Sequence, residues 1–67
     1  MQQPKKQDGD RITGQRWIEG KLCLLSGRYF GESAKAEAQA HAKRERAQGF
    51  FARVIKRHSW DYLVYRL

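Results

Sequence analysis

The sequence predicts a small α+β domain of two layers, in which one helix packs on a mostly antiparallel sheet. Three features support this fold class: strand-forming residues precede an alanine-rich segment, and two alternating apolar segments follow it. Sixty-seven residues are enough for one domain only, and we place it at residues 11–67. Residues 1–10 contain no large apolar side chain except Met1, so we expect them to form a disordered N-terminal arm.

The first block after the arm is rich in apolar and aromatic residues that favour extended chain. Its strongest predicted strand covers residues 21–25. This strand pairs either with residues 16–18 or with residues 28–30, and the pattern does not distinguish the two pairings. The dipeptides Glu19-Gly20 and Ser26-Gly27 are predicted to form tight turns.

The second block, residues 33–48, is predicted to be a helix because alanine favours helices and is a poor strand former. Ser33 is suited to the N-cap, and Gly49 is a natural stop after the last turn. Two alanine stripes at helical spacing compete to face the sheet, namely Ala34, Ala38 and Ala42, or Ala36, Ala40 and Ala47. We expect the second stripe to face it, which leaves His41 and Glu45 on the surface. The first would place them at the edge of the core as an i, i+4 pair.

The third block is predicted to be a hairpin, with strands at residues 50–57 and 60–67 joined by a turn at His58-Ser59. Both faces of this hairpin carry large apolar residues. One face is expected to pack on the helix, and the other to bind a partner or to be buried in a homodimer. In so short a chain, we expect Trp17 and Trp60 to be needed mainly for the core.

Charge gives the clearest indication of function. Fourteen Lys and Arg residues against seven Asp and Glu give a net charge of +7, which attracts polyanions at long range. If the helix end lies next to the hairpin tip, six cations meet in one patch: Lys43, Arg44, Arg46, Arg53, Lys56 and Arg57. Beside them, Trp60 and Tyr62 could stack on unpaired bases. We therefore expect a small basic protein that binds DNA or RNA through the phosphate backbone.

Residues that support catalysis or bind metals are sparse. His41 and His58 are far apart, and Cys23 lies in an apolar segment where we expect a buried, unreactive thiol. One Cys and two distant His lack the spacing of zinc ligands, and no glycine-rich phosphate loop is present. We predict no enzyme activity, no metal and no cofactor. A single cysteine and the absence of a long apolar run indicate a cytoplasmic protein without a membrane partner.

The second half of the chain resembles known families. Ser33, the alanine-rich helix through Ala47, Gln48-Gly49 and the strands at 50–54 and 62–65 look like the strand-helix-hairpin half of SPOR-type domains. The same residues are similar to small phage anti-CRISPR proteins built from a sheet and a helix. The anti-CRISPR likeness implies a protein that blocks a nucleoprotein complex, or binds DNA beside it, through a basic surface. The alternative function is therefore a phage- or plasmid-type interaction module or inhibitor that docks on an acidic partner surface or homodimerises.

Overall fold

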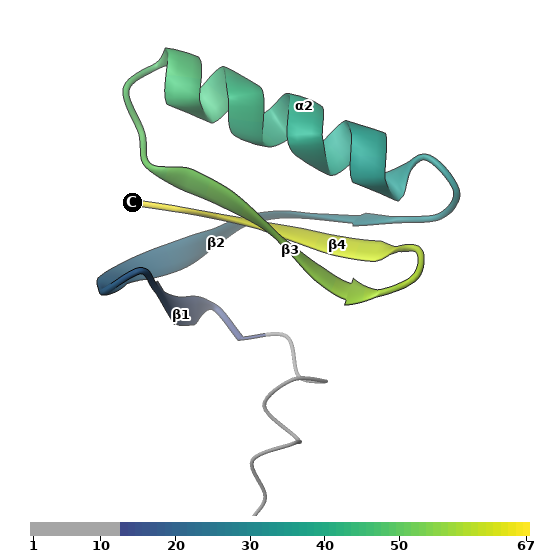
Figure 1. The fold of residues 1–67 in the computed structure, drawn as a ribbon, viewed down its shortest axis with the longest axis horizontal. Coiled ribbons are helices and arrows are strands. Elements are labelled where there is room, and N and C mark those ends of the chain that lie inside the picture. Colours follow the sequence, from purple (N-terminus) through teal and green to yellow (C-terminus); the bar gives the residue numbers. More distant parts are fainter. Residues whose placement is uncertain (1–12) are drawn as a thin grey trace, which may run out of the picture.

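The computed structural model describes residues 13–67, and it confirms the predicted α+β class. Four antiparallel strands form one sheet with the order β1-β2-β4-β3, and a single helix packs on one face of it (Figure 1). The predicted arm at 1–10 lies outside the described residues. The elements in chain order are β1 (Gln15–Ile18), β2 (Lys21–Phe30), α2 (Ala34–Ala47), β3 (Ala52–His58) and β4 (Asp61–Arg66).

Strand β2 is longer than the sequence suggests. Its first half pairs with β1, with Trp17 opposite Leu22, and its second half pairs with β4. The predicted turn at Ser26-Gly27 is therefore wrong, because the strand continues through it with a bulge where the register shifts. A glycine inside a strand often marks such a bulge or a close approach of another group. The turn at Glu19-Gly20 is confirmed, and both residues have positive φ, at 53° and 80°.

Helix α2 presents Ala34, Ala38 and Ala42 to the sheet, and all three are buried. The expectation that the other alanine stripe faces the sheet was wrong. Arg44 lies four residues after Ala40 and three before Ala47, so that stripe would carry a guanidinium into the core, where an unpaired charge is costly. Ser33 occupies the N-cap position but makes no side-chain cap hydrogen bond. Gly49 ends the helix with a φ of 98°, as predicted.

Two hydrophobic clusters lie on the two faces of the sheet. The helix-side cluster combines the buried alanines of α2 with Ala52, Tyr62 and Val64. The second cluster lies on the opposite face and contains Cys23, Leu63 and Tyr65, with Ile18, Leu25, Phe51 and Ile55 packed against it. Cys23 is buried, as predicted.

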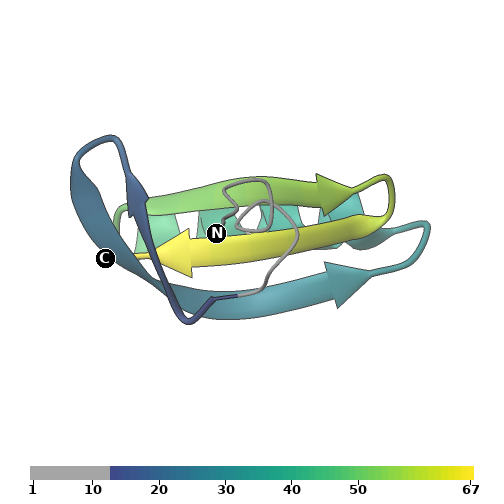
Figure 2. The same cartoon turned by 90° about the horizontal axis from the view of Figure 1, so that it is seen from below.

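The sheet curls, so that β1 crosses the face opposite the helix (Figure 2). This curl brings Ile18 of β1 against the second cluster. Tyr65 is 0% exposed and its hydroxyl donates a hydrogen bond to the Thr13 carbonyl at 2.7 Å. The expectation that this whole face needs a partner is therefore corrected, because its central residues are already buried.

The two tryptophans do not fill the core. The β3–β4 turn lies at Ser59-Trp60, one residue later than predicted, and Trp60 is 57% exposed there. Trp17 is 69% exposed on β1. A helix of 14 residues is only about 21 Å long, so it cannot cover the β1–β2 hairpin as well as the other strands. Trp17 lies on that uncovered hairpin, and Trp60 lies in the two-residue turn at the end of the sheet, so both core expectations for tryptophan were wrong.

Candidate functional site

The structure does not bring the six predicted cations together in one patch, because the helix end and the hairpin tip lie apart. Arg46, near the end of α2, donates from Nε to the Ala52 carbonyl at 3.1 Å, so the helix end lies beside the start of β3. The hairpin tip lies at the other end of β3, where the Gly31 amide donates to the Trp60 carbonyl at 2.8 Å (Figure 1). The four residue-to-residue steps of strand from Ala52 to Lys56 span about 13 Å. The expected single patch at the helix end and hairpin tip is therefore replaced by a longer arrangement along β3.

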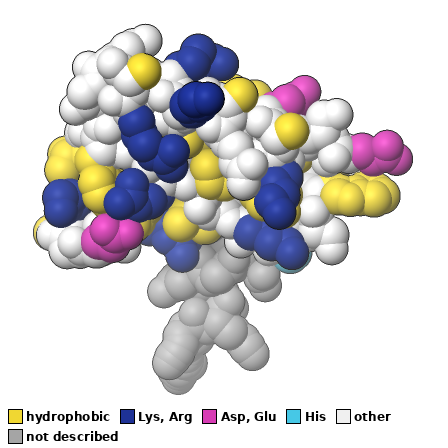
Figure 3. Space-filling model, turned by 45° about the horizontal axis from the view of Figure 1, so that its top comes forward, with side chains coloured by type: hydrophobic (Ala, Val, Ile, Leu, Met, Phe, Trp, Pro, Cys, Tyr) yellow, Lys and Arg dark blue, Asp and Glu magenta, His cyan; other side chains and the backbone are white. Residues whose placement is uncertain are grey.

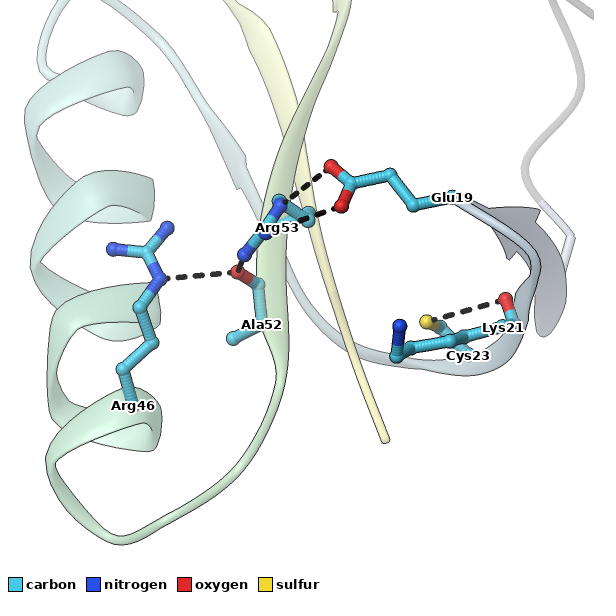
Figure 4. A network of polar contacts seen from close by, with 6 residues as sticks. All are labelled: Glu19, Lys21, Cys23, Arg46, Ala52 and Arg53. Atoms are coloured by element: carbon cyan, nitrogen blue, oxygen red, sulfur yellow. Dashed lines mark hydrogen bonds and ion pairs between the residues drawn. The ribbon is translucent and has the colours of Figure 1, made fainter.

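Arg53 is one of two predicted cations that pair with acids. Its Nε lies 3.1 Å from Glu19 Oε2, which ties the edge strand β3 to the β1–β2 turn at the other edge of the curled sheet. Arg53 Nη1 also donates to the Ala52 carbonyl at 2.9 Å, so this carbonyl accepts from both Arg46 and Arg53 (Figure 4). The hydrogen bond and the charge of Arg53 lower the pKa of Glu19. Arg53 thus helps to hold the two edges of the curled sheet together.

Arg57 pairs with Asp61, the first residue of β4 after the β3–β4 turn. Asp61 is 1% exposed and lies between Arg57 Nη1 at 2.7 Å and Arg28 Nη2 at 3.0 Å. The hydrogen bond from Arg28 lowers the pKa of Asp61, burial opposes this, and Arg57 adds to the lowering. Asp61 in turn raises the pKa of Arg28. These three side chains form a charged cluster that fixes the tip of the hairpin.

Three of the remaining predicted cations, together with Lys35, lie where the flank of α2 faces β3. Lys35 directly follows the buried Ala34 and Lys43 directly follows the buried Ala42, so both lie on the same side of the helix. Arg46 lies about one turn after Lys43 on that side. Lys56 lies opposite Tyr62 in the β3–β4 register, so it projects on the helix side of the edge strand. We call Lys35, Lys43, Arg46 and Lys56 the basic strip. All four are exposed, and within residues 13–67 no ion pair involves any of them.

A space-filling view onto the helix layer shows Lys and Arg side chains spread across this face, with acidic side chains toward its margins (Figure 3). Arg44 is also exposed, but it lies on the outer side of the helix, away from the sheet. Of the six predicted cations, Lys43, Arg46 and Lys56 thus belong to the basic strip. Arg44 is a neighbour of the strip, and Arg53 and Arg57 support the fold.

The opposite flank of α2 faces β2 and contains a polar network that the sequence indicated only through the His41–Glu45 spacing. His41 Nδ1 is 2.8 Å from the Tyr29 hydroxyl, and Nε2 is 3.0 Å from the Ser26 hydroxyl and 3.3 Å from Glu45 Oε2. Glu45 Oε1 accepts from Arg66 Nη1 at 2.9 Å. Burial alone would raise the pKa of Glu45, but Arg66 and His41 lower it below its ordinary value.

This network differs from a catalytic triad. In a triad, a carboxylate holds the imidazole nitrogen opposite to the one that faces the serine. Here Ser26 and Glu45 both lie at Nε2 of His41, and Tyr29 occupies Nδ1. The arrangement joins the helix to the bulge of β2 and is best explained as a structural anchor.

The exposed aromatic residues differ from those predicted. Tyr62 is 8% exposed and packs in the helix-side cluster, so its ring is not available to stack on a base. Trp60 is exposed at the turn, and Phe30 at the end of β2 is 74% exposed. The sequence did not single out Phe30 as an exposed ring, because residues 28–30 were interpreted only as a strand. Its position directly before Gly31, where the strand ends, was the signal that could have distinguished it.

Within residues 13–67, no group of three or more His, Cys, Asp or Glu side chains could hold a metal ion. In the same range, no helix has the length and apolar character needed to cross a membrane. No protein-family model matches the chain, no curated protein is significantly similar to it, and no solved structure significantly matches it. The resemblance to SPOR-type and anti-CRISPR proteins therefore stays a prediction.

Proposed function

We propose that this protein is a non-enzymatic nucleic-acid-binding protein that contacts phosphates through the basic strip. One observation carries the proposal: the strip's four cations are exposed on one flank of the helix layer and enter no ion pair among residues 13–67. Four arginines are instead paired with acids, namely Arg28 and Arg57 with Asp61, Arg53 with Glu19, and Arg66 with Glu45, so they offer less charge to a partner than the strip does. The net charge of +7 adds long-range attraction for any polyanion.

The size of the strip suits a short stretch of phosphate backbone. From Lys35 to Arg46 the helix rises about 16 Å, and one strand of a duplex carries a phosphate about every 3.4 Å along the axis. Three to four cations over this length can therefore reach a few neighbouring phosphates. Phosphate contacts position a protein but carry no sequence information, so we expect binding that tolerates many sequences.

The test is fluorescence anisotropy with labelled oligonucleotides over about 50 to 200 mM salt. The variant K43Q/K56Q removes two charges from the basic strip, and R16Q/K21Q removes two from the β1–β2 hairpin. Each lost phosphate contact reduces the slope of log affinity against log salt by about 0.9 for a duplex. We expect the first variant to lose about two such contacts and the second to keep the slope. Absence of binding at low salt, or equal loss in both variants, would overturn the proposal.

A second candidate function is self-association through the β1–β2 hairpin. Trp17 and Leu22 face each other across the two strands, Leu24 lies two positions further on the same face, and all three are exposed. β1 is also an edge strand, and its unpaired backbone groups can accept a strand from a second copy. The apolar surface that the sequence predicted on the hairpin of β3 and β4 thus lies on the β1–β2 hairpin instead.

This candidate predicts a dimer. Sedimentation equilibrium of the natural protein should show a concentration-dependent dimer, and W17S/L24S should be monomeric under the same conditions. A monomer at every concentration for the natural protein would exclude self-association and leave the nucleic-acid proposal untouched.

A further inference from the structure

We infer that the nucleic acid is single-stranded and that an unpaired base stacks on the aromatic tip formed by Phe30 and Trp60. This inference rests on the proposed function and specifies the class of partner. Both rings are more than half exposed, and neither belongs to the two hydrophobic clusters. The chain has only two Trp and three Phe, yet these two large rings lie outside the core and contribute little to the stability of the fold.

The backbone beneath the aromatic tip is fixed. Phe30 is paired with Asp61 in the β2–β4 register, and the next residue, Gly31, donates its amide to the Trp60 carbonyl at 2.8 Å. The Arg28 guanidinium lies 5.7 Å from the centre of the Phe30 ring and is itself held by Asp61. Rings carried on such a tied pair of strands lose little entropy when a flat ligand stacks on them.

Charge around the aromatic tip suits a phosphate chain. Arg28 and Arg57 both pair with the buried Asp61, so two positive charges more than offset its single negative charge. Glu32, on the segment between β2 and α2, is an exposed acid near the tip and opposes the approach of a phosphate from that side. Lys56, the last member of the basic strip, lies only four residues before Trp60. A nucleic-acid strand whose phosphates follow the strip past Lys56 therefore reaches the turn that carries Trp60, and Phe30 projects beside Arg28 on the other face of the same end of the sheet.

This continuity favours a single strand over a duplex. In a duplex the faces of the bases are covered by their neighbours, so a duplex could use the basic strip but not the two rings. An unpaired strand offers both phosphates and base faces, and stacking on aromatic rings is the common way to bind it. The tip therefore adds affinity only for a single strand.

The experiment compares a labelled oligothymidylate with a duplex of the same length, using W60A and, as its matched control, W17A. Both tryptophans are exposed, so neither change should unfold the protein. We expect W60A to weaken binding of the single strand about tenfold and to leave the duplex affinity unchanged, since only an unpaired base can stack on the ring. W17A lies outside the aromatic tip, so whatever it does to self-association it should leave the ratio of the single-strand and duplex affinities unchanged. In W17F, where Trp60 is the one tryptophan, the single strand should quench the remaining fluorescence.

The outcomes separate this inference from the proposed function. If the protein binds both oligonucleotides through the basic strip but W60A has no effect, the stacking site is disproved and phosphate binding stands. Tighter binding of the duplex than of the single strand would also overturn the inference. If K43Q/K56Q and W60A are both without effect because nothing binds, both proposals fail together.

Discussion

The two flanks of helix α2 carry charges of opposite sign, and the side chains of one flank make more polar contacts with the sheet than those of the other. The flank that faces β2 contains Glu37, His41 and Glu45, and the last two enter the network with Ser26, Tyr29 and Arg66. The flank that faces β3 carries Lys35, Lys43 and Arg46, and only Arg46 makes a hydrogen bond to the rest of the protein among residues 13–67. Both flanks border the same buried alanine stripe.

The difference between the flanks shows how a small domain with a thin core can fix one packing of its helix on its sheet. Alanine gives little shape to an interface, so the polar network on the β2 side fixes how the helix is rotated on the sheet. On the β3 side, Arg46 adds one hydrogen bond to the Ala52 carbonyl, whereas Lys35 and Lys43 remain exposed to solvent. Three substitutions test the comparison.

The largest effect is expected beneath the helix, between the two flanks. Ala38 is fully buried against the sheet, so A38L forces extra volume into a closely packed interface and should lower the free energy of unfolding by about 2 kcal/mol. The matched control is A40L, on the exposed outer side, where a change within about 0.5 kcal/mol is expected. Urea denaturation measures both. Equal effects would mean that the helix has no unique rotation on the sheet.

A smaller effect is expected at Gly27, where the β2 flank meets the bulge. A Cβ placed there would lie 2.7 Å from Cε1 of His41, so G27A must displace a ring that Tyr29 and Ser26 hold. We expect a loss of about 1.5 kcal/mol, which combines the clash with weakened hydrogen bonds.

Gly14 provides the control for this prediction, because a Cβ there meets nothing within 4 Å. G14A should therefore change the unfolding free energy by less than about 0.5 kcal/mol. In the double variant G27A/H41A the two effects should not add, since the clash needs the imidazole. Simple additivity would show that the glycine is required for another reason.

The smallest of the three effects is expected from E45Q, and it depends on pH. The folded-state pKa of Glu45 lies below its ordinary value of 4.5, so its ionised form stabilises the protein above pH 4.5. That contribution disappears as the pH falls through the lower folded-state pKa. The difference in unfolding free energy between the natural protein and E45Q should therefore be largest near neutral pH and shrink below pH 4.5.

The fold could be predicted well from the sequence, because its signals are local. Gly49 stops the helix, Glu19-Gly20 makes a turn, and alternation in β3 places Ala52 and Val54 on the helix side. The wrong turn at Ser26-Gly27 shows the limit of such signals. The same glycine that marks a turn in an isolated peptide here makes room for His41, which comes from another element.

The candidate site was predictable in kind but not in shape. The surplus of cations was evident, and Lys43, Arg46 and Lys56 were among the residues named. That Arg53 and Arg57 would pair with Glu19 and Asp61 depended on the curl of the sheet and the pairing of its strands. The exposure of Phe30 and Trp60 likewise depended on where the helix ends relative to the strands.

The amino-acid sequence by itself determined the charge surplus, the helix and its ends, and the order of the elements, because each follows from residue types close together in the chain. Tertiary structure decided which alanine stripe is buried, which cations are neutralised and which aromatic rings reach solvent. These choices depend on contacts between residues distant in sequence, where the energies of alternative pairings differ by little until the whole sheet is formed.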